Sequence, residues 1–263
     1  MKVKKAIIPA AGRGMRMKKV DSNLPKELLK IGKKPMIDYV LNELENTSIE
    51  DVFIIISKQK DILKNHLKRK KYHFNLNFIY QPKPYGLAEA ILRAKDYIKD
   101  ESFLISLPDN LSLGRVNVSS KIISSFERYK KNLISCIKIS RKRAYQFSNA
   151  GNIDYENYEN TKDMIKITKF HPKRKGPFRI TNSSYKIRTF ARYIFMPYLF
   201  DYIKMIKDKT DLRKKELDDV PVIQEMLKSK IILGLIVDNK GIFDCGNIEG
   251  YSACCEFVKR KML

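Results

Sequence analysis

Short apolar runs separated by amphipathic segments fill the first 107 residues of the chain. The runs predict buried strands at residues 6–8, 52–56, 77–81 and 103–107. Apolar positions at helical spacing predict helices between them, at residues 35–44, 61–69 and 87–94. Strands that alternate with helices of these lengths are typical of a parallel sheet with right-handed crossovers. We therefore predict an α/β fold.

The second half of the chain is less regular. Its predicted strands are residues 133–139, 165–170, 189–196, 231–237 and 242–244, and its predicted helices are residues 197–207, 216–228 and 248–261. A polar segment, rich in tyrosine and asparagine, precedes the strand at 165–170, and a basic loop follows it. Neither a repeat nor a low-complexity linker interrupts the chain. We predict a single domain over residues 1–263, with residues 140–185 as a cap over the functional site.

The excess of basic residues bears on which ligands the protein can bind. Lys and Arg number 53 against 29 Asp and Glu, which gives a formal net charge of +24. The lysines are spread along the chain, and no helix-turn-helix, RNA-recognition or zinc signature accompanies them. We therefore expect no nucleic acid ligand, although a phosphorylated substrate is attracted by this charge.

Cysteine usage and hydropathy indicate the compartment. The four cysteines are Cys136, Cys245, Cys254 and Cys255, and their spacing suggests neither a disulfide framework nor a zinc site. The apolar run near the start is too short for a secretory signal, and no apolar run approaches the ~18 residues that span a bilayer. We expect a cytoplasmic protein with no membrane insertion.

The first predicted strand runs into a glycine-containing loop that is suited to phosphate. Gly12 and Gly14 follow the strand, Arg16 comes next, and Lys26 stands in a Pro-Lys-Glu segment. Glycines at such a turn allow positive φ and a close approach of backbone N–H groups to an anion. The stretch lacks the P-loop pattern, and Met17 occupies the place of the third glycine of the dinucleotide fingerprint.

This stretch resembles the signature of the sugar-1-phosphate nucleotidyltransferases, roughly Ala-Ala-Gly-x-Gly-Thr-Arg-Met followed by Pro-Lys-Glu. A second segment, from Gln81 to Ala90, is similar to the part of that family that reads the base. The resemblance is closest to the bacterial UTP–glucose-1-phosphate uridylyltransferases. It implies a Rossmann-like, mostly parallel sheet with helices on both faces and a small β-rich cap, and a homo-oligomer.

The resemblance also implies roles for the nucleotide half of the site. It assigns nucleotide binding to Ala10, Ala11, Gly12, Gly14, Lys26, Gln81 and Gly86. Within that set the glutamine pairs with the pyrimidine edge, and the glycine at 86 lets the backbone close over the base. Arg16 and Lys26 engage the phosphates, and with Asp109 they form the catalytic set.

Two carboxylates are candidate Mg²⁺ ligands. Asp109 follows a predicted parallel strand, at the sheet edge where open α/β folds bind their ligands. Leu-Pro-Asp-Asn at this place resembles the family's metal-binding turn, and Phe-Asp-Cys-Gly around Asp244 resembles its aromatic-Asp-Cys-Gly. The resemblance implies that both aspartates bind Mg²⁺.

The sugar half departs from the family pattern. Aligned on Pro172, the family's Val-Glu-Lys-Pro becomes Lys169-Phe170-His171-Pro172, so a hydroxyl acceptor and a lysine are missing. Lys169 or Lys173 can substitute if the register slips. We assign sugar-phosphate binding to Gly151, Lys169, His171 and Arg192.

Three functions remain open at this point. The first is a Mg²⁺-dependent transfer of a nucleotide from a nucleoside triphosphate, with UTP favoured, to a hexose 1-phosphate such as glucose 1-phosphate. The second is the same transfer to a different phosphorylated acceptor, which the altered segment suggests. The third is a nucleotide-binding protein without turnover, although such a protein has no need for two metal-binding carboxylates.

Overall fold

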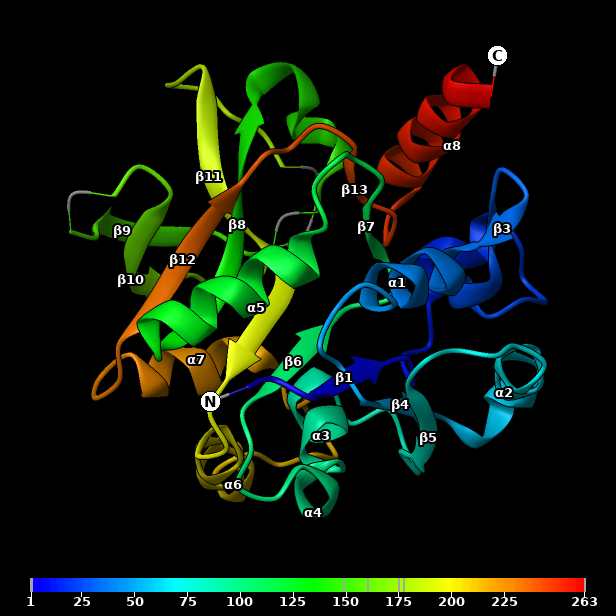
Figure 1. The fold of residues 1–263 in the computed structure, drawn as a ribbon, viewed down its shortest axis with the longest axis horizontal. Helices are drawn as coiled ribbons and strands as arrows, with labels where there is room; N and C mark the ends of the chain where they lie inside the picture. Colours follow the sequence, from blue (N-terminus) through cyan, green and yellow to red (C-terminus); the bar gives the residue numbers. More distant parts are fainter. Residues whose placement is uncertain (1, 149, 160, 175, 177, 263) are drawn as a thin grey trace.

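Nine strands form one central sheet through both halves of the chain (Figure 1). The computed structural model describes residues 2–148, 150–159, 161–174, 176 and 178–262. Across the sheet the strands are β5 (Asn75–Tyr80), β4 (Asp51–Ile56), β1 (Lys5–Pro9), β6 (Phe103–Ser106), β11 (Tyr185–Phe195), β8 (Asn132–Ser140), β12 (Ile232–Val237), β10 (Met164–Phe170) and β9 (Ile153–Asn157).

The sheet is mostly parallel, as expected. Neighbouring strands from β5 to β6 are all parallel, as are β8 and β12. Only β11 and β10 run opposite to the other seven strands, because each pairs antiparallel with both of its neighbours. The carboxyl ends of β1, β4, β5, β6 and β8 therefore lie at one edge of the sheet, and β11 begins at that same edge.

Helices cover both faces of this sheet, which confirms the expected layering. One core packs α1 (Met36–Leu44), α2 (Asp61–Lys68), α5 (Val118–Tyr129) and α8 (Ile248–Met262) on one face. The other core packs α3 (Leu87–Leu92), α4 (Lys95–Ile98), α6 (Leu199–Asp208) and α7 (Asp219–Met226). In β1, Ala6 and Ile8 join the first core and Ile7 joins the second, as the alternation of side chains along a strand requires.

The sequence pattern did not predict two larger elements, α5 and β9. We did not identify α5, whose apolar face is interrupted by serines and a lysine and whose start is capped by Asn117. The polar segment contains β9, an edge strand whose solvated face accepts polar residues. Because β9 and β10 extend the central sheet, residues 140–185 do not form a separate sheet, although they supply part of the cavity wall.

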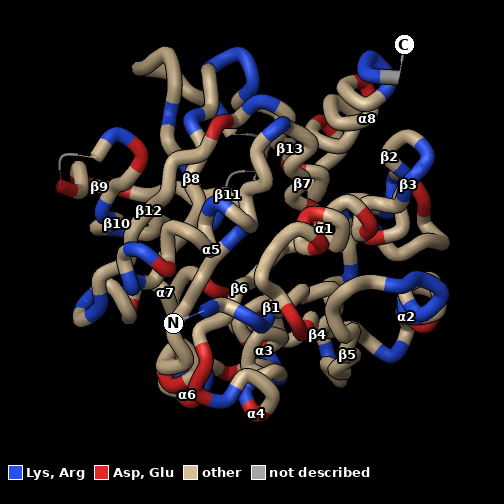
Figure 2. Tube along the Cα trace, viewed as in Figure 1, with Lys and Arg blue, Asp and Glu red and all other residues tan. Residues whose placement is uncertain are grey.

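Smaller elements complete the chain. They are the pairs β2 (Lys30–Ile31) with β3 (Lys34–Pro35) and β7 (Asn110–Ser112) with β13 (Ile242–Asp244), and the 3-10 turns η1 (Met15–Lys19), η2 (Lys26–Leu28), η3 (Lys58–Lys60) and η4 (Arg141–Gln146). Lys and Arg are distributed along the whole trace (Figure 2). None of the helices in the described ranges is both long and apolar enough to cross a membrane.

Candidate active site

A cavity of about 930 Å³ opens at the edge of the sheet where the parallel strands end. Arg16, which follows β1, and Leu87, which follows β5, contribute to its wall. Asp109 and Asp244 line it from the centre, and Gly151 lines it from the second half of the chain. Segments that are far apart in the sequence thus meet here because most strands of the sheet run in the same direction.

The loop after β1 has the backbone that its glycines predict. Ala10 and Ala11 are buried, whereas a Cβ on Gly12 would meet nothing within 4 Å, so the loop is open on that side. Gly14 has a φ of +63°, which favours glycine, and it begins η1. A Cβ on Gly14 would lie 3.4 Å from the side chain of Lys26, so the absence of a side chain lets this lysine pack against the loop.

Lys26 forms an ion pair with Asp109, 2.5 Å between Nζ and Oδ2. Burial lowers the pKa of Lys26, but the charges of Asp109 and Glu27 outweigh it and the net shift is upward. Burial likewise raises the pKa of Asp109, but Lys26 and a hydrogen bond from Asn110 bring the pKa below its usual value. Both groups therefore stay charged through the neutral pH range, as phosphate and metal binding require.

A second buried lysine supports the loop from behind. Lys60 follows β4 and donates to the carbonyl oxygen of Ala10 at 2.6 Å and to both carboxylate oxygens of Glu27 at 2.9 and 2.8 Å. Glu27 is fully buried. This contact ties the glycine loop to the Pro-Lys-Glu segment and so fixes the position of the two segments relative to each other.

The two candidate metal ligands meet through a short pair of strands. β7 and β13 pair antiparallel, with Asn110 opposite Asp244. The amide of Cys245 donates to the carbonyl oxygen of Asp109 at 2.7 Å. This pairing brings together two aspartates that are more than a hundred residues apart in the sequence.

Gly246 keeps the space between the two carboxylates open. A Cβ built on Gly246 would lie 2.7 Å from Oδ2 of Asp109 and 3.2 Å from Oδ1 of Asp244. Asp244 is itself fixed by the amides of Ser148 at 2.7 Å and Gly246 at 3.1 Å. The described residues contain no cluster of three acidic, histidine or cysteine ligands, so an ion here would rely on these two carboxylates, substrate phosphates and water. That donor set fits Mg²⁺.

Gln81 has a fixed side-chain orientation. Its amide nitrogen donates to Oε2 of Glu89 at 2.6 Å and to the carbonyl oxygen of Gly86 at 3.1 Å. A carboxylate only accepts hydrogen bonds, so the glutamine's NH₂ group must face Glu89, which Arg93 holds in turn. Gly86 has a φ of +109°, and a Cβ there would lie 2.4 Å from the carbonyl oxygen of Leu217. Gln81 itself is buried and does not line the cavity.

In the sugar half, the cavity wall includes Gly151 and Lys173. Gly151 has a φ of +72° and leaves space for the hydroxyl of Thr189, 2.3 Å from where a Cβ would be. Lys173 donates to Asp218 at 2.5 Å and to Asp219 at 2.7 Å. Lys173 thus lies in the cavity wall, where a substitute for the family lysine would have to lie. Its amino group, however, is already neutralised by two carboxylates.

Lys169 and His171 lie away from the cavity. Lys169 is on the exposed face of β10, and His171 is bound to Asp154 on β9, 2.9 Å from Nε2 to Oδ1. Neither contributes to the cavity wall, whereas Phe170 between them does. The alternation of side chains along β10 explains this result, because residues on either side of a buried position face the other way.

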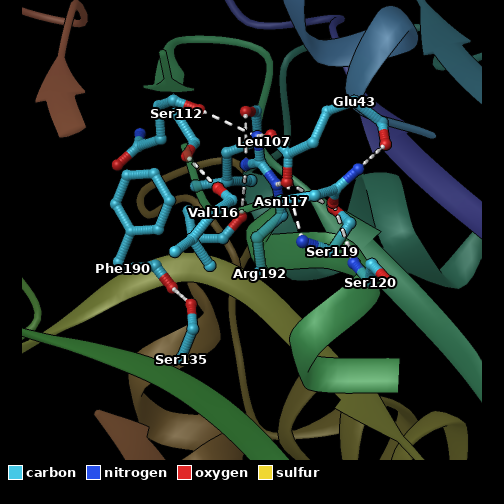
Figure 3. A network of polar contacts seen from close by, with 12 residues as sticks. Glu43, Leu107, Ser112, Val116, Asn117, Ser119, Ser120, Ser135, Phe190 and Arg192 are labelled. Carbon is cyan, nitrogen blue, oxygen red and sulfur yellow. Dashed lines mark hydrogen bonds and ion pairs between the residues drawn. The ribbon is translucent and has the colours of Figure 1, made fainter. Parts of the chain in front are cut away.

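Arg192 is also away from the cavity wall, because its guanidinium is used inside the protein (Figure 3). It is fully buried, and it donates to Glu43 through Nε at 3.0 Å and Nη2 at 2.6 Å. Its Nη1 and Nη2 also reach the carbonyl oxygens of Leu107 and Asn110 at 3.4 and 3.1 Å. Arg192 therefore holds the turn that carries Asp109 and does not contact the site directly.

Two buried cations at this sheet edge, Lys60 and Arg188, are not among the site residues predicted from the sequence. Lys60 follows the apolar run of β4, so its place after a parallel strand was a usable signal. Arg188 and Arg192 are buried in β11, and a cation among buried positions requires either a partner or a ligand. Arg188 lines the cavity.

Comparison with known proteins gives consistent matches. A sequence model of the nucleotidyl transferase family matches residues 5–261. UTP–glucose-1-phosphate uridylyltransferase 1 of Staphylococcus saprophyticus is 29% identical over 226 residues, which cover 78% of this chain and 76% of that protein. A putative UTP–glucose-1-phosphate uridylyltransferase of Methanocaldococcus jannaschii is 24% identical over 271 residues, covering 95% and 90%.

Solved structures share the fold. A crystal structure of apo UDP-glucose pyrophosphorylase superposes with a TM-score of 0.80 at 23% identity, covering 99% of this chain and 100% of that one. A UDP-glucose pyrophosphorylase in complex with UDP-glucose gives a TM-score of 0.76 at 21% identity, covering 98% and 99%.

Proposed function

The chain belongs to the nucleotidyl transferase family, and we propose that it transfers a nucleotide from UTP to a sugar 1-phosphate, releasing pyrophosphate. Glucose 1-phosphate is the favoured acceptor, because relatives that align over three quarters or more of this chain carry that substrate in their names. One observation carries the proposal. Asp109 and Asp244 face the same space beside Gly246 in the cavity wall, and Lys26, packed against Gly14 of the glycine loop, forms an ion pair with Asp109.

The reaction needs little covalent participation from the protein. An oxygen of the acceptor phosphate attacks the α-phosphorus in line, the new P–O bond forms, and the bond to the β-phosphate breaks so that pyrophosphate leaves. The attacking phosphate is largely ionised near neutral pH, so no side chain has to remove a proton from it. The task of the protein is to position two polyanions and to offset their charge.

The residues of the site divide this task. The open face of the loop at Gly12 offers backbone N–H groups to the triphosphate, and Arg16 and Lys26 add positive charge beside it. Asp109 and Asp244 would hold Mg²⁺, which supplies the charge that neutralises the phosphates during transfer. Lys60 holds the glycine loop and the Pro-Lys-Glu segment together by hydrogen bonds to Ala10 and Glu27.

A different phosphorylated acceptor is the second candidate, and the wall of the cavity favours it over an inactive protein. Lys169 and His171 point elsewhere, and Phe147, Phe170 and Phe190 give the cavity an apolar side. These rings offer no hydrogen-bond partner to sugar hydroxyls, so an acceptor with an apolar substituent fits this side of the cavity better.

A pyrophosphate-release screen tests the proposal and separates these acceptors. Each nucleoside triphosphate is combined with Mg²⁺ and a panel of sugar phosphates that includes glucose 1-phosphate. We expect release with UTP and at least one acceptor, and EDTA should abolish it. Release with UTP and an acceptor other than glucose 1-phosphate selects the second candidate. An absence of release with every pair contradicts both.

We predict that Gln81 selects uracil or thymine over cytosine. Glu89 orients the amide so that Oε1 remains as an acceptor, which suits the N3–H of uracil but not the N3 acceptor of cytosine. Wild type should favour UTP over CTP, and Glu89→Leu should reduce this preference by roughly fivefold, because a hydrogen bond worth about 1 kcal/mol no longer orients the amide. Isothermal titration calorimetry with UTP, dTTP, CTP and ATP measures the preference.

Gln81→Leu is the matched control for this prediction. It removes the acceptor itself, so all pyrimidine triphosphates should then bind with similar, weaker affinity. Equal binding of pyrimidine and purine triphosphates by wild type would remove the base-reading role from Gln81.

A further inference from the structure

Arg188 is a buried cation in the wall of the cavity. It is 2% exposed, and none of its Nε, Nη1 and Nη2 atoms has a hydrogen-bond partner among the described residues. The guanidinium lies over the ring of Phe178, 4.0 Å from its centroid. Contact with a ring face satisfies no N–H donor, so the described residues leave the five N–H groups of this guanidinium without an acceptor.

The contrast with Arg192 makes this state unusual. Both arginines lie on one face of β11, four residues apart, and both are buried. Arg192 has a carboxylate and three carbonyl oxygens as partners, whereas Arg188 has no hydrogen-bond partner within the described part of the chain. An unpaired buried charge is strongly unfavourable. The presence of Arg188 in the cavity wall therefore suggests that a ligand pairs with its charge.

Arg188 remains charged and lies beside the candidate metal site. Burial lowers its pKa to about 10, while the negative charge of Asp244 acts in the opposite direction. The guanidinium is therefore protonated at neutral pH. Since β11 runs antiparallel to β6 with Arg192 opposite Ser106, Arg188 extends past the carboxyl end of β6, on the side where Asp109 lies.

Three other described cations of the acceptor half are less suited than Arg188 to hold an anion. Lys173 is neutralised by Asp218 and Asp219, and His171 is bound to Asp154. Arg174 lines the cavity but is exposed to solvent, where an ion pair contributes little. Arg188 is buried in an apolar wall, where a charge pair is much stronger than in water.

We propose that Arg188 binds the phosphate of the acceptor and positions it for attack beside Asp109 and Asp244. The planar guanidinium suits bidentate binding of a phosphate. The phosphate oxygens supply the hydrogen-bond acceptors that the described residues do not give to Arg188. This proposal rests on the proposed function for the identity of the acceptor. The anion site itself rests only on the geometry of Arg188.

The first test uses stability and needs no turnover. Arg188→Met replaces an unpaired cation by an apolar side chain of similar length, so the ligand-free variant should melt at a higher temperature than wild type. Inorganic phosphate and glucose 1-phosphate should each raise the melting temperature of wild type and raise that of the variant much less. Arg16 and Lys26 remain in both proteins, so phosphate bound there contributes equally.

Kinetics provide the second test, with Lys186→Met as the control. Arg188→Met should raise KM for the acceptor by roughly 10- to 100-fold, as expected for a lost charge-assisted contact, and leave KM for UTP unchanged. Arg188→Lys, which keeps the charge and loses the planar fork, should fall between the two. Lys186→Met removes an exposed cation from the same strand, and should leave both KM values unchanged.

The outcomes separate the two proposals. If wild type releases no pyrophosphate but Arg188→Met still loses the phosphate-induced stabilisation, the anion site stands and the proposed function fails. If wild type turns over and Arg188→Met has an unchanged KM for the acceptor, the role of Arg188 is wrong and the function stands. A variant that melts lower than wild type, or fails to fold, contradicts the unpaired state from which the proposal starts.

Discussion

Replacing Asp109 by asparagine will slow nucleotidyl transfer by a factor on the order of 10²–10³, the range for removing one preorganised charge-stabilising group. The substitution keeps the shape of the side chain and deletes the charge that faces Lys26 and the space beside Gly246. Negative charge on the two substrates then lacks part of its metal-mediated compensation. The fall in rate is measured as the rate of pyrophosphate release at saturating substrates, over a range of Mg²⁺ concentrations.

Asp244→Asn should behave in the same way, because Asp244 faces the same space from β13. Both variants should require more Mg²⁺ for half-maximal rate, which a general loss of folding would not produce. Asp100→Asn is the control, since this exposed residue precedes β6 and so lies at the opposite edge of the sheet. Full activity in Asp109→Asn would remove this residue from the metal site.

Replacing Arg192 by methionine will lower the free energy of unfolding by about 3–5 kcal/mol, the range for breaking one side of a buried ion pair. Glu43 would remain buried, and among the described residues Ser119 alone would still donate to its carboxylate, from its hydroxyl at 2.6 Å and its amide at 2.9 Å (Figure 3). The carbonyl oxygens of Leu107 and Asn110 would also lose a donor. Urea denaturation followed by circular dichroism measures the change.

A double variant tests this explanation. Adding Glu43→Leu to Arg192→Met removes the orphaned carboxylate, so most of the lost stability should return. Arg192→Met and Arg188→Met, two changes on one strand, are expected to shift stability in opposite directions. If the single Arg192 variant is as stable as wild type, the network around Glu43 does not hold the Asp109 turn as we describe.

The alternation of apolar runs and helical segments was sufficient to predict the framework. The strands of the first half lie where those runs are, because a strand covered on both faces has to be continuously apolar. The glycine loop was equally readable, since the positive φ of Gly14 is one that glycine adopts at little cost. These features depend on local sequence alone. A polar edge strand such as β9 carries no such signal.

Which side chains meet was decided by the tertiary structure. Asp109 and Asp244 converge through the pairing of β7 with β13. Each strand has three residues, and so short a strand carries too little sequence pattern to predict its partner. Phe170 faces the cavity while His171 turns to Asp154, because the pleat of β10 alternates the faces. The sequence names a cation but not its partner. Arg192 is neutralised by a glutamate 149 positions away, and Arg188 has no hydrogen-bond partner among the described residues, because the packing of strands and helices decides which distant groups meet.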